Sequence, residues 1–184
     1  MLDLYSILFL GITLVSSTVT LCALPQQFRG STHNKRFLFF YLLTIAATVG
    51  FFLSGTNLMK QFCFFEIMTL ASFAYVPNDE SEYAKKASFS YLAYGIAGGL
   101  VMLYGLMILY YMFGTFELTD IRQMWIAFEG TPVNRRNLFI AGVCLLFGYG
   151  AKAGMFPLHT WLPDTYTEAP PVGTTLLSSL LSKT

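Results

Sequence analysis

The chain has 184 residues, of which 55% are hydrophobic, 17% aromatic and only 11% charged. A soluble domain is typically about 25% charged, and a soluble domain of this length has too small an interior to bury so many apolar side chains. The net charge of +1 gives no indication of a nucleic acid or of an acidic substrate as a partner. The composition therefore predicts an integral membrane protein in contact with lipid.

Apolar runs of about 20 residues, the length needed for a helix to cross a bilayer, follow one another along the chain. The run 37–76 is too long for one helix, and Ser54-Gly55-Thr56-Asn57 is the expected turn within it. We predict an all-α membrane protein, a single transmembrane domain over 1–184 with a bundle of about six helices. The predicted spans are 4–24, 37–54, 57–76, 87–114, 137–163 and 170–184, the last one incomplete.

Within the fourth span, Gly95 and Gly99 form a small-xxx-small face where another helix can approach closely. The three cysteines are far apart in sequence and have neither metal-ligand nor disulfide spacing. No nucleophile–base pair or cofactor motif is visible either. We therefore expect no metal, no cofactor and no catalytic site belonging to this chain alone.

Three charged residues, Glu66, Lys152 and Lys183, fall inside predicted spans. A charge at the centre of a membrane helix costs about 2.5–3.5 kcal/mol on insertion scales, so each needs a partner or a purpose. Glu66 is nine residues into its span, roughly 13 Å from one surface at 1.5 Å per residue. It is either a titrating group on an ion path or a carboxyl group satisfied by a neighbouring hydroxyl or cation.

Lys152 lies among helix-breaking residues, with Gly150 and Gly154 on either side and Pro157 further on. This pattern predicts that the fifth span, 137–163, is a broken helix interrupted between Gly150 and Pro157. Unwound backbone at membrane depth is tolerated only inside protein or beside a wet cavity, and transporters place ion sites at such breaks. We expect these three residues to form a hinge beside an ion-path lysine.

The last predicted helix carries hydroxyl groups at helical spacing that lead to Lys183. Thr175, Ser178 and Ser179 belong to this polar track, which indicates either a hydrated path or ordinary contacts between helices. His159 precedes the helix and is either an interfacial side chain next to an aromatic anchor or a proton relay between Lys152 and Lys183.

The segment from Lys152 to Lys183, KAGMFPLHTWLPDTYTEAPPVGTTLLSSLLSK, resembles the signature of the antiporter-like membrane subunits. These subunits occur in respiratory complex I (NADH-quinone oxidoreductase), in Mrp-type Na⁺/H⁺ antiporters and in energy-converting membrane hydrogenases. The upstream segment Phe64-Phe65-Glu66-Ile67-Met68 is similar to the family's glutamate-bearing fifth helix. By this resemblance the chain corresponds to a fragment from about the third helix of the family fold to the start of the eighth.

The resemblance implies roles for four residues. Glu66 and Lys152 would form an interacting pair whose separation changes the lysine's affinity for a proton. His159 would belong to the connecting segment, and Lys183 would receive the proton on the eighth helix. The family fold continues beyond these helices on both sides, so we expect the 184 residues not to work alone.

The function expected from the resemblance is translocation of protons or sodium ions by a subunit of a multisubunit complex, coupled to NADH/quinone or hydrogenase electron transfer. An Mrp-type antiporter subunit and a non-transporting membrane scaffold are the alternatives. The expected partners are other membrane subunits of a respiratory, hydrogenase or Mrp complex, a chain that supplies the missing helices, and lipid, with no nucleic acid. The expected location is a bacterial or archaeal cytoplasmic membrane or, alternatively, the mitochondrial inner membrane.

Overall fold

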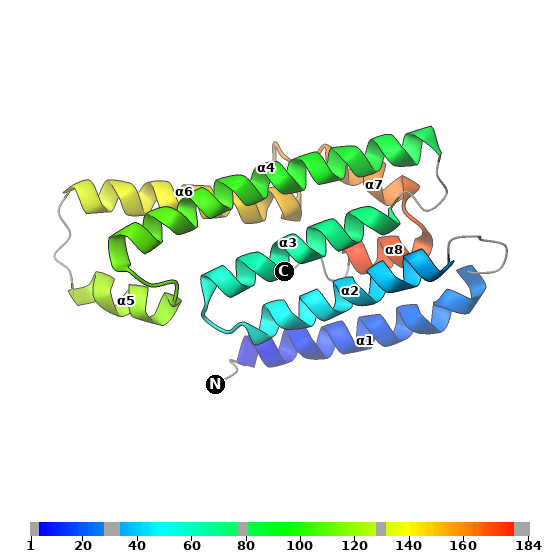
Figure 1. The fold of residues 1–184 in the computed structure, drawn as a ribbon, viewed down its shortest axis with the longest axis horizontal. Coiled ribbons are helices and arrows are strands. Elements are labelled where there is room, and N and C mark those ends of the chain that lie inside the picture. The colour runs from blue at the N-terminus through cyan, green and yellow to red at the C-terminus, as the bar shows by residue number, and fades with distance from the viewer. Residues whose placement is uncertain (1–3, 28–33, 77–80, 128–131, 179–184) are drawn as a thin grey trace.

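The computed structural model describes residues 4–27, 34–76, 81–127 and 132–178. Over these ranges the chain is helical, and its only pairing of extended backbone is one isolated bridge between Asn57 and Glu117. The all-α fold class predicted from the sequence is confirmed, and Figure 1 shows an elongated bundle. The helices are α1 (Leu4–Gln27), α2 (Asn34–Leu53), α3 (Leu58–Tyr75), α4 (Glu82–Phe113), α5 (Leu118–Ala127), α6 (Pro132–Ala153), α7 (Trp161–Glu168) and α8 (Pro171–Leu176).

Three of the described helices contain segments long and apolar enough to cross a membrane: Ser6–Pro25, Lys35–Leu53 and Glu82–Phe113. Helices α3 and α6 reach 18 and 22 residues, but they carry the charged residues Glu66 and Lys152. Large apolar side chains are exposed along α1, α2 and α4, among them Leu14, Phe39 and Leu100. Exposed apolar surface of this extent is typical of contact with lipid or with partner helices.

The helices differ in length from the predicted spans, which remain predictions because a helix end does not mark a membrane surface. Helix α4 begins five residues before the predicted span 87–114, where Ser81 accepts a hydrogen bond from the backbone N–H of Ala84. Helix α6 begins at Pro132 and ends at Ala153, whereas the predicted span covered 137–163. Between the predicted spans 87–114 and 137–163 lies α5, whose sequence alternates polar and apolar residues with helical period.

Glycines determine how closely α4 approaches its two neighbours. A Cβ atom at Gly98 would lie 2.7 Å from the Cβ of Ala151 on α6, and one at Gly105 would lie 2.8 Å from the Cβ of Cys144. Gly95 and Gly99 face α3 instead. The close neighbour that the sequence predicts at this small-residue face is therefore α3. Because none of these positions carries a side chain, α4 packs tightly against both α3 and α6 and holds the two helices near each other.

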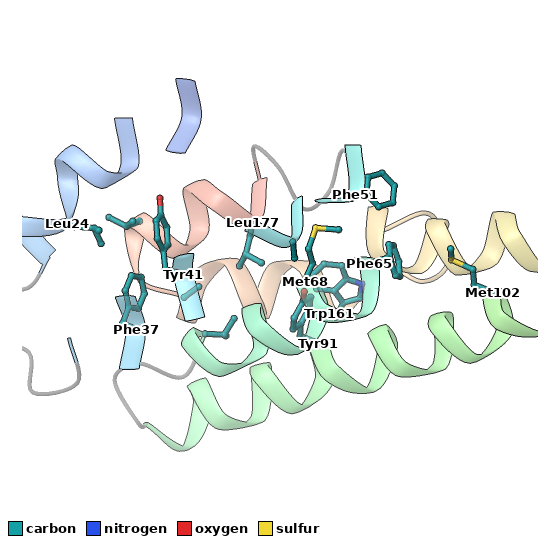
Figure 2. Close-up of a cluster of buried hydrophobic side chains, with 14 residues drawn as sticks. Leu24, Phe37, Tyr41, Phe51, Phe65, Met68, Tyr91, Met102, Trp161 and Leu177 are labelled. Atoms are coloured by element: carbon teal, nitrogen blue, oxygen red, sulfur yellow. The ribbon is translucent and has the colours of Figure 1, made fainter. Parts of the chain in front are cut away.

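Hydroxyl groups and rings join the helices inside the bundle. The hydroxyl of Tyr91 on α4 forms a 2.5 Å hydrogen bond with the hydroxyl of Ser72 on α3. The hydroxyls of Thr20 and Tyr41 connect α1 with α2 in the same way. Figure 2 shows Tyr91 beside Trp161, and the centroids of their rings lie 5.0 Å apart. These contacts satisfy polar groups that would otherwise be stranded in an apolar interior.

Helix α5 lies at one end of the bundle, between α4 and α6 in the chain (Figure 1). Its Ile121 is buried and packs with an apolar cluster formed by Leu58, Leu106, Leu109 and Ala141. Glu117, just before α5, accepts hydrogen bonds from Thr56 Oγ1 at 2.8 Å and from Asn57 Nδ2 at 2.7 Å. The turn between α2 and α3 is thereby fixed to the segment between α4 and α5, and this arrangement is called the Glu117 clamp below.

Candidate functional site

Glu66 is presented by the middle of α3. This helix begins after Asn57, whose side chain accepts a hydrogen bond from the backbone N–H of Lys60 and so caps the first turn. Glu66 is half-buried and faces α4, where a Cβ at Gly99 would lie 2.9 Å from the carboxyl carbon of Glu66 and still closer to one carboxyl oxygen. The carboxyl group of Glu66 therefore occupies space that exists because residue 99 is glycine.

Lys152 comes from the last turn of α6 and is only 4% exposed. Its ammonium group donates hydrogen bonds to the backbone carbonyl oxygen of Phe65 at 3.0 Å and to the hydroxyl oxygen of Thr69 at 3.2 Å. It also lies 4.0 Å from the centroid of the Phe65 ring, at the distance of a cation–π interaction. All three contacts are with α3, so a charge from α6 is buried against the helix that carries Glu66.

Glu66 and Lys152 are neighbours, but they do not form a direct ion pair in this conformation. The two groups interact electrostatically, and Phe65, which Lys152 contacts, directly precedes Glu66. The Oε1 atom of Glu66 is buried and accepts no hydrogen bond from the described residues. The charge of Lys152 is instead stabilised by the Phe65 carbonyl oxygen, the Thr69 hydroxyl and the face of the Phe65 ring.

The predicted break of the helix around Lys152 is confirmed. Helix α6 ends at Ala153, and Gly154 has a φ of 71°, a left-handed conformation that favours glycine. The backbone N–H of Met155 donates to the carbonyl oxygen of Gly150 at 2.8 Å, which with the left-handed glycine makes a Schellman-type helix end. Pro157 lies in the turn that follows, and it is exposed.

Trp161 closes this break from the other side. It is the first residue of α7, and its indole N–H donates to the carbonyl oxygen of Ala151 at 2.9 Å. This oxygen belongs to the last turn of α6, where carbonyl groups lack a partner within the helix. The residue next to Lys152 is therefore fixed to the start of α7.

The remaining predicted ion-path residues make contacts of another kind. His159 is exposed, and its ring stacks on Phe156 at 5.8 Å between centroids. The hydroxyl of Thr175 donates to the carbonyl oxygen of Pro171 at 2.8 Å, and that of Ser178 donates to the carbonyl oxygen of Thr175 at 3.5 Å. Ser179 and Lys183 lie outside the described residues. A polar track from Lys152 to Lys183 stays a prediction.

Sequence reasoning missed two residues at this site, Thr69 and Trp161. Thr69 lies three residues after Glu66, and this spacing places both on one face of α3, which was an available signal. For Trp161 the sequence indicates only an aromatic anchor at the membrane surface. Its hydrogen bond to Ala151 depends on how the chain turns after Gly154, and no sequence pattern predicts that turn.

Known proteins resemble the chain over nearly its whole length. It is 30% identical over 179 residues to F(420)H(2) dehydrogenase subunit N of Methanosarcina mazei, covering 95% of this chain and 34% of that protein. It is 27% identical to a Na(+)/H(+) antiporter subunit of Alkalihalophilus pseudofirmus, covering 98% of this chain and 36% of that protein. The chain thus spans about a third of the length of these curated relatives.

The fold has a solved counterpart in the membrane-bound sulfane sulfur reductase, an archaeal respiratory membrane complex. One chain of that complex superposes with a TM-score of 0.82 at 23% identity, over 94% of this chain and 34% of the other. The sequence profile of the transmembrane family described as NADH:quinone oxidoreductase/Mrp antiporter matches residues 55–184, which include Glu66, Thr69 and Lys152. The chain is therefore an integral membrane protein that belongs to the NADH:quinone oxidoreductase/Mrp antiporter transmembrane family.

Proposed function

We propose that this chain provides part of a path by which protons, or alternatively sodium ions, cross a membrane within a multisubunit complex. The observation that carries the proposal is the Lys152 ammonium, buried at a helix break and held by uncharged groups of α3. Glu66 follows Phe65 directly on α3, and one oxygen of its carboxyl group is buried and accepts no hydrogen bond from the described residues.

A stability role alone does not account for this arrangement. A buried ion pair is stabilised when the two charges contact each other and all their hydrogen-bonding atoms are satisfied. Here the Lys152 ammonium contacts α3 beside Glu66 without forming a direct ion pair with it. An acid and a base whose contact can be made or broken are what a proton-transfer step needs, since their separation changes the energy of each charged form.

We further propose that the translocation is coupled to electron transfer in a respiratory or hydrogenase complex. Support comes from the relative named F(420)H(2) dehydrogenase subunit N and from the family description, which includes NADH:quinone oxidoreductase. The relative named as a Na(+)/H(+) antiporter subunit supports an Mrp-type subunit as the second candidate. In either case the proposed partners are other membrane subunits of the complex.

The proposal is tested with the full-length protein in its complex, in inverted membrane vesicles from the source cells. Gradient formation is followed with a pH-sensitive dye, with and without sodium, for Glu66→Gln and for Glu117→Gln as a matched control. We expect Glu66→Gln to reduce pumping at least about tenfold while the complex still assembles, because a positioned proton-transfer group typically contributes ~10²–10⁴-fold. Glu117→Gln should pump normally, since that carboxylate belongs to the clamp at the end of the bundle.

Normal pumping by Glu66→Gln would support the scaffold alternative and refute the proposal. Dependence on sodium would identify the ion, and dependence on a reduced electron donor would separate a redox complex from an antiporter.

A further inference from the structure

We propose that Thr69 is a positioning residue that gives the Lys152 ammonium a second docking position, three residues along α3 from Glu66. This inference rests on the proposed function and adds to it a residue of α3 that works through the lysine. The lysine would alternate between contact with the Glu66 carboxylate and the position observed here, in which it contacts Thr69 and the Phe65 carbonyl.

The observed position of the ammonium is well defined. Lys152 is 4% exposed, and its donors reach a carbonyl oxygen at 3.0 Å and a hydroxyl oxygen at 3.2 Å. The Thr69 hydroxyl itself donates to the same Phe65 carbonyl oxygen at 2.9 Å. With its hydrogen committed to Phe65, the Thr69 oxygen presents lone pairs to the ammonium, so the three groups form a closed triangle.

The distance to the alternative position is short. Glu66 and Thr69 lie three residues apart, on neighbouring positions of one helix face. Three residues correspond to a rise of roughly 4.5 Å along α3. The long, flexible side chain of a lysine covers such a distance by changing rotamers, and neither α3 nor α6 has to move.

The two positions differ in charge. Beside Glu66 the ammonium would contact a carboxylate, whereas at Thr69 it contacts a hydroxyl and a carbonyl dipole. The ammonium donates charge-assisted hydrogen bonds at both positions, but only the position beside Glu66 adds the attraction of a full opposite charge. The Thr69 position therefore holds the charged lysine without the carboxylate, which leaves Glu66 free to exchange its own proton.

The packing around Thr69 shows why a threonine suits this position. A Cβ at Gly95 of α4 would lie 2.5 Å from the Thr69 methyl group, so the methyl fills the space left by that glycine. The hydroxyl points to Lys152 while the methyl points to α4. One side chain thus serves both contacts, and each contact can be removed separately by substitution.

The test compares Thr69→Val, which keeps the methyl and removes the hydroxyl, with Thr69→Ser, which keeps the hydroxyl and removes the methyl. Both variants are made in the full-length protein and assayed for pumping in vesicles across a range of pH. We expect Thr69→Val to lower pumping several-fold and to move the alkaline limit of activity by roughly 0.5–1 pH unit toward lower pH, the effect of one lost hydrogen bond on the charged lysine. Thr69→Ser should restore the original pH profile.

A purely structural role for Thr69 predicts the reverse order, with Thr69→Ser impaired and Thr69→Val near normal, and that result would overturn the inference. Thr44→Val is the control, because Thr44 is also buried in a helix but donates to the carbonyl of Phe40, away from the site. If Thr69→Val does not assemble, Thr69→Ala repeats the loss of the hydroxyl with a smaller side chain, and an unchanged pH profile in Thr69→Ala would equally overturn the inference.

Glu66→Gln in the same assay separates this inference from the proposed function. If Glu66→Gln abolishes pumping and Thr69→Val does not alter it, the second docking position is wrong and the ion path stands. If Glu66→Gln pumps normally, both proposals fail together.

Discussion

Two glutamates in this chain have opposite surroundings. Glu117 lies between α4 and α5 at the end of the bundle, and each of its carboxylate oxygens accepts a hydrogen bond, one from Thr56 and one from Asn57. Glu66 lies in the middle of α3, where its Oε1 atom is buried and accepts no hydrogen bond from the described residues. The neighbouring ammonium of Lys152 donates to Phe65 and Thr69 of the same helix instead.

Glu117 has the surroundings of a carboxylate that stabilises the fold, and Glu66 has the surroundings that the proposed proton transfer requires. Hydrogen bonds to both oxygens of a carboxylate favour its charged form and restrict it to one geometry. A buried oxygen that lacks a donor costs free energy, about 1–3 kcal/mol or more for a charged group. A protein retains such an unfavourable group where the group contributes to function. The four predictions that follow test this contrast between Glu117 and Glu66.

The largest effect should come from Lys152→Ala. Removing the ammonium takes away the only side-chain cation that the described residues bring to the Glu66 turn, and pumping should fall at least about tenfold. Assembly should remain largely intact, since the Phe65 carbonyl keeps the Thr69 hydroxyl as a donor. Pumping in vesicles and the amount of assembled complex on a native gel measure the two effects. Loss of assembly in parallel with loss of pumping would instead make Lys152 a structural residue.

Gly99→Ala should have the next largest effect, because its methyl group would overlap the Glu66 carboxyl group. Overpacking of this kind costs about 1–3 kcal/mol, and the carboxyl group or α4 must shift in response. We expect pumping to fall several-fold with a smaller loss of thermal stability. Gly142→Ala on α6 is the matched control, because a Cβ there meets nothing within 4 Å. Equal pumping by the two variants would show that the position of Glu66 does not depend on Gly99.

Glu117→Ala should affect stability and leave pumping nearly unchanged. The substitution removes both side-chain hydrogen bonds of the Glu117 clamp, while the backbone hydrogen bond from Leu118 to Thr56 at 2.9 Å remains. We expect a slightly lower melting temperature in detergent, with Asn57→Ala giving a similar decrease. A large loss of pumping at an unchanged melting temperature would remove the distinction between the two glutamates.

The smallest effect concerns pH. Hydrogen bonds from Asn57 and then Thr56 lower the pKa of Glu117 below its ordinary value of 4.5. A lowered pKa in the folded state means that the contribution of the clamp to stability is complete above about pH 4.5 and is lost as the pH falls through the lowered pKa. The difference in melting temperature between the original protein and Glu117→Gln should therefore shrink on acidification. A difference that grows at low pH would contradict this assignment.

The sequence alone was sufficient to find the central residues of the candidate site. A glutamate and a lysine inside apolar runs are visible without a structure, because burying a charge in a membrane is costly. The helix break was also visible in the sequence, as glycines and a proline around Lys152. In the structure Gly154 adopts the left-handed conformation that favours glycine.

What the sequence could not supply are contacts that depend on how helices rotate and approach. Thr69 and the Phe65 carbonyl are ordinary parts of an apolar helix until α6 places Lys152 against them. Glu117 is one of several charged residues in a polar segment, and its partners are about 60 residues away in the chain. Periodicity indicates which face of a helix is apolar, but it does not indicate which neighbour meets that face.

The hydrogen bond from the Trp161 indole to the Ala151 carbonyl oxygen restrains the helix break beside Lys152. The left-handed turn at Gly154 and the indole hydrogen bond to Ala151 hold the two sides of the break together in this conformation. Trp161 is itself wedged against Tyr91 of α4, with ring centroids 5.0 Å apart. Bending α6 at this point would have to displace α7 and disturb α4 as well. The proposed movement of the Lys152 side chain between Glu66 and Thr69, on one face of α3, requires none of these displacements.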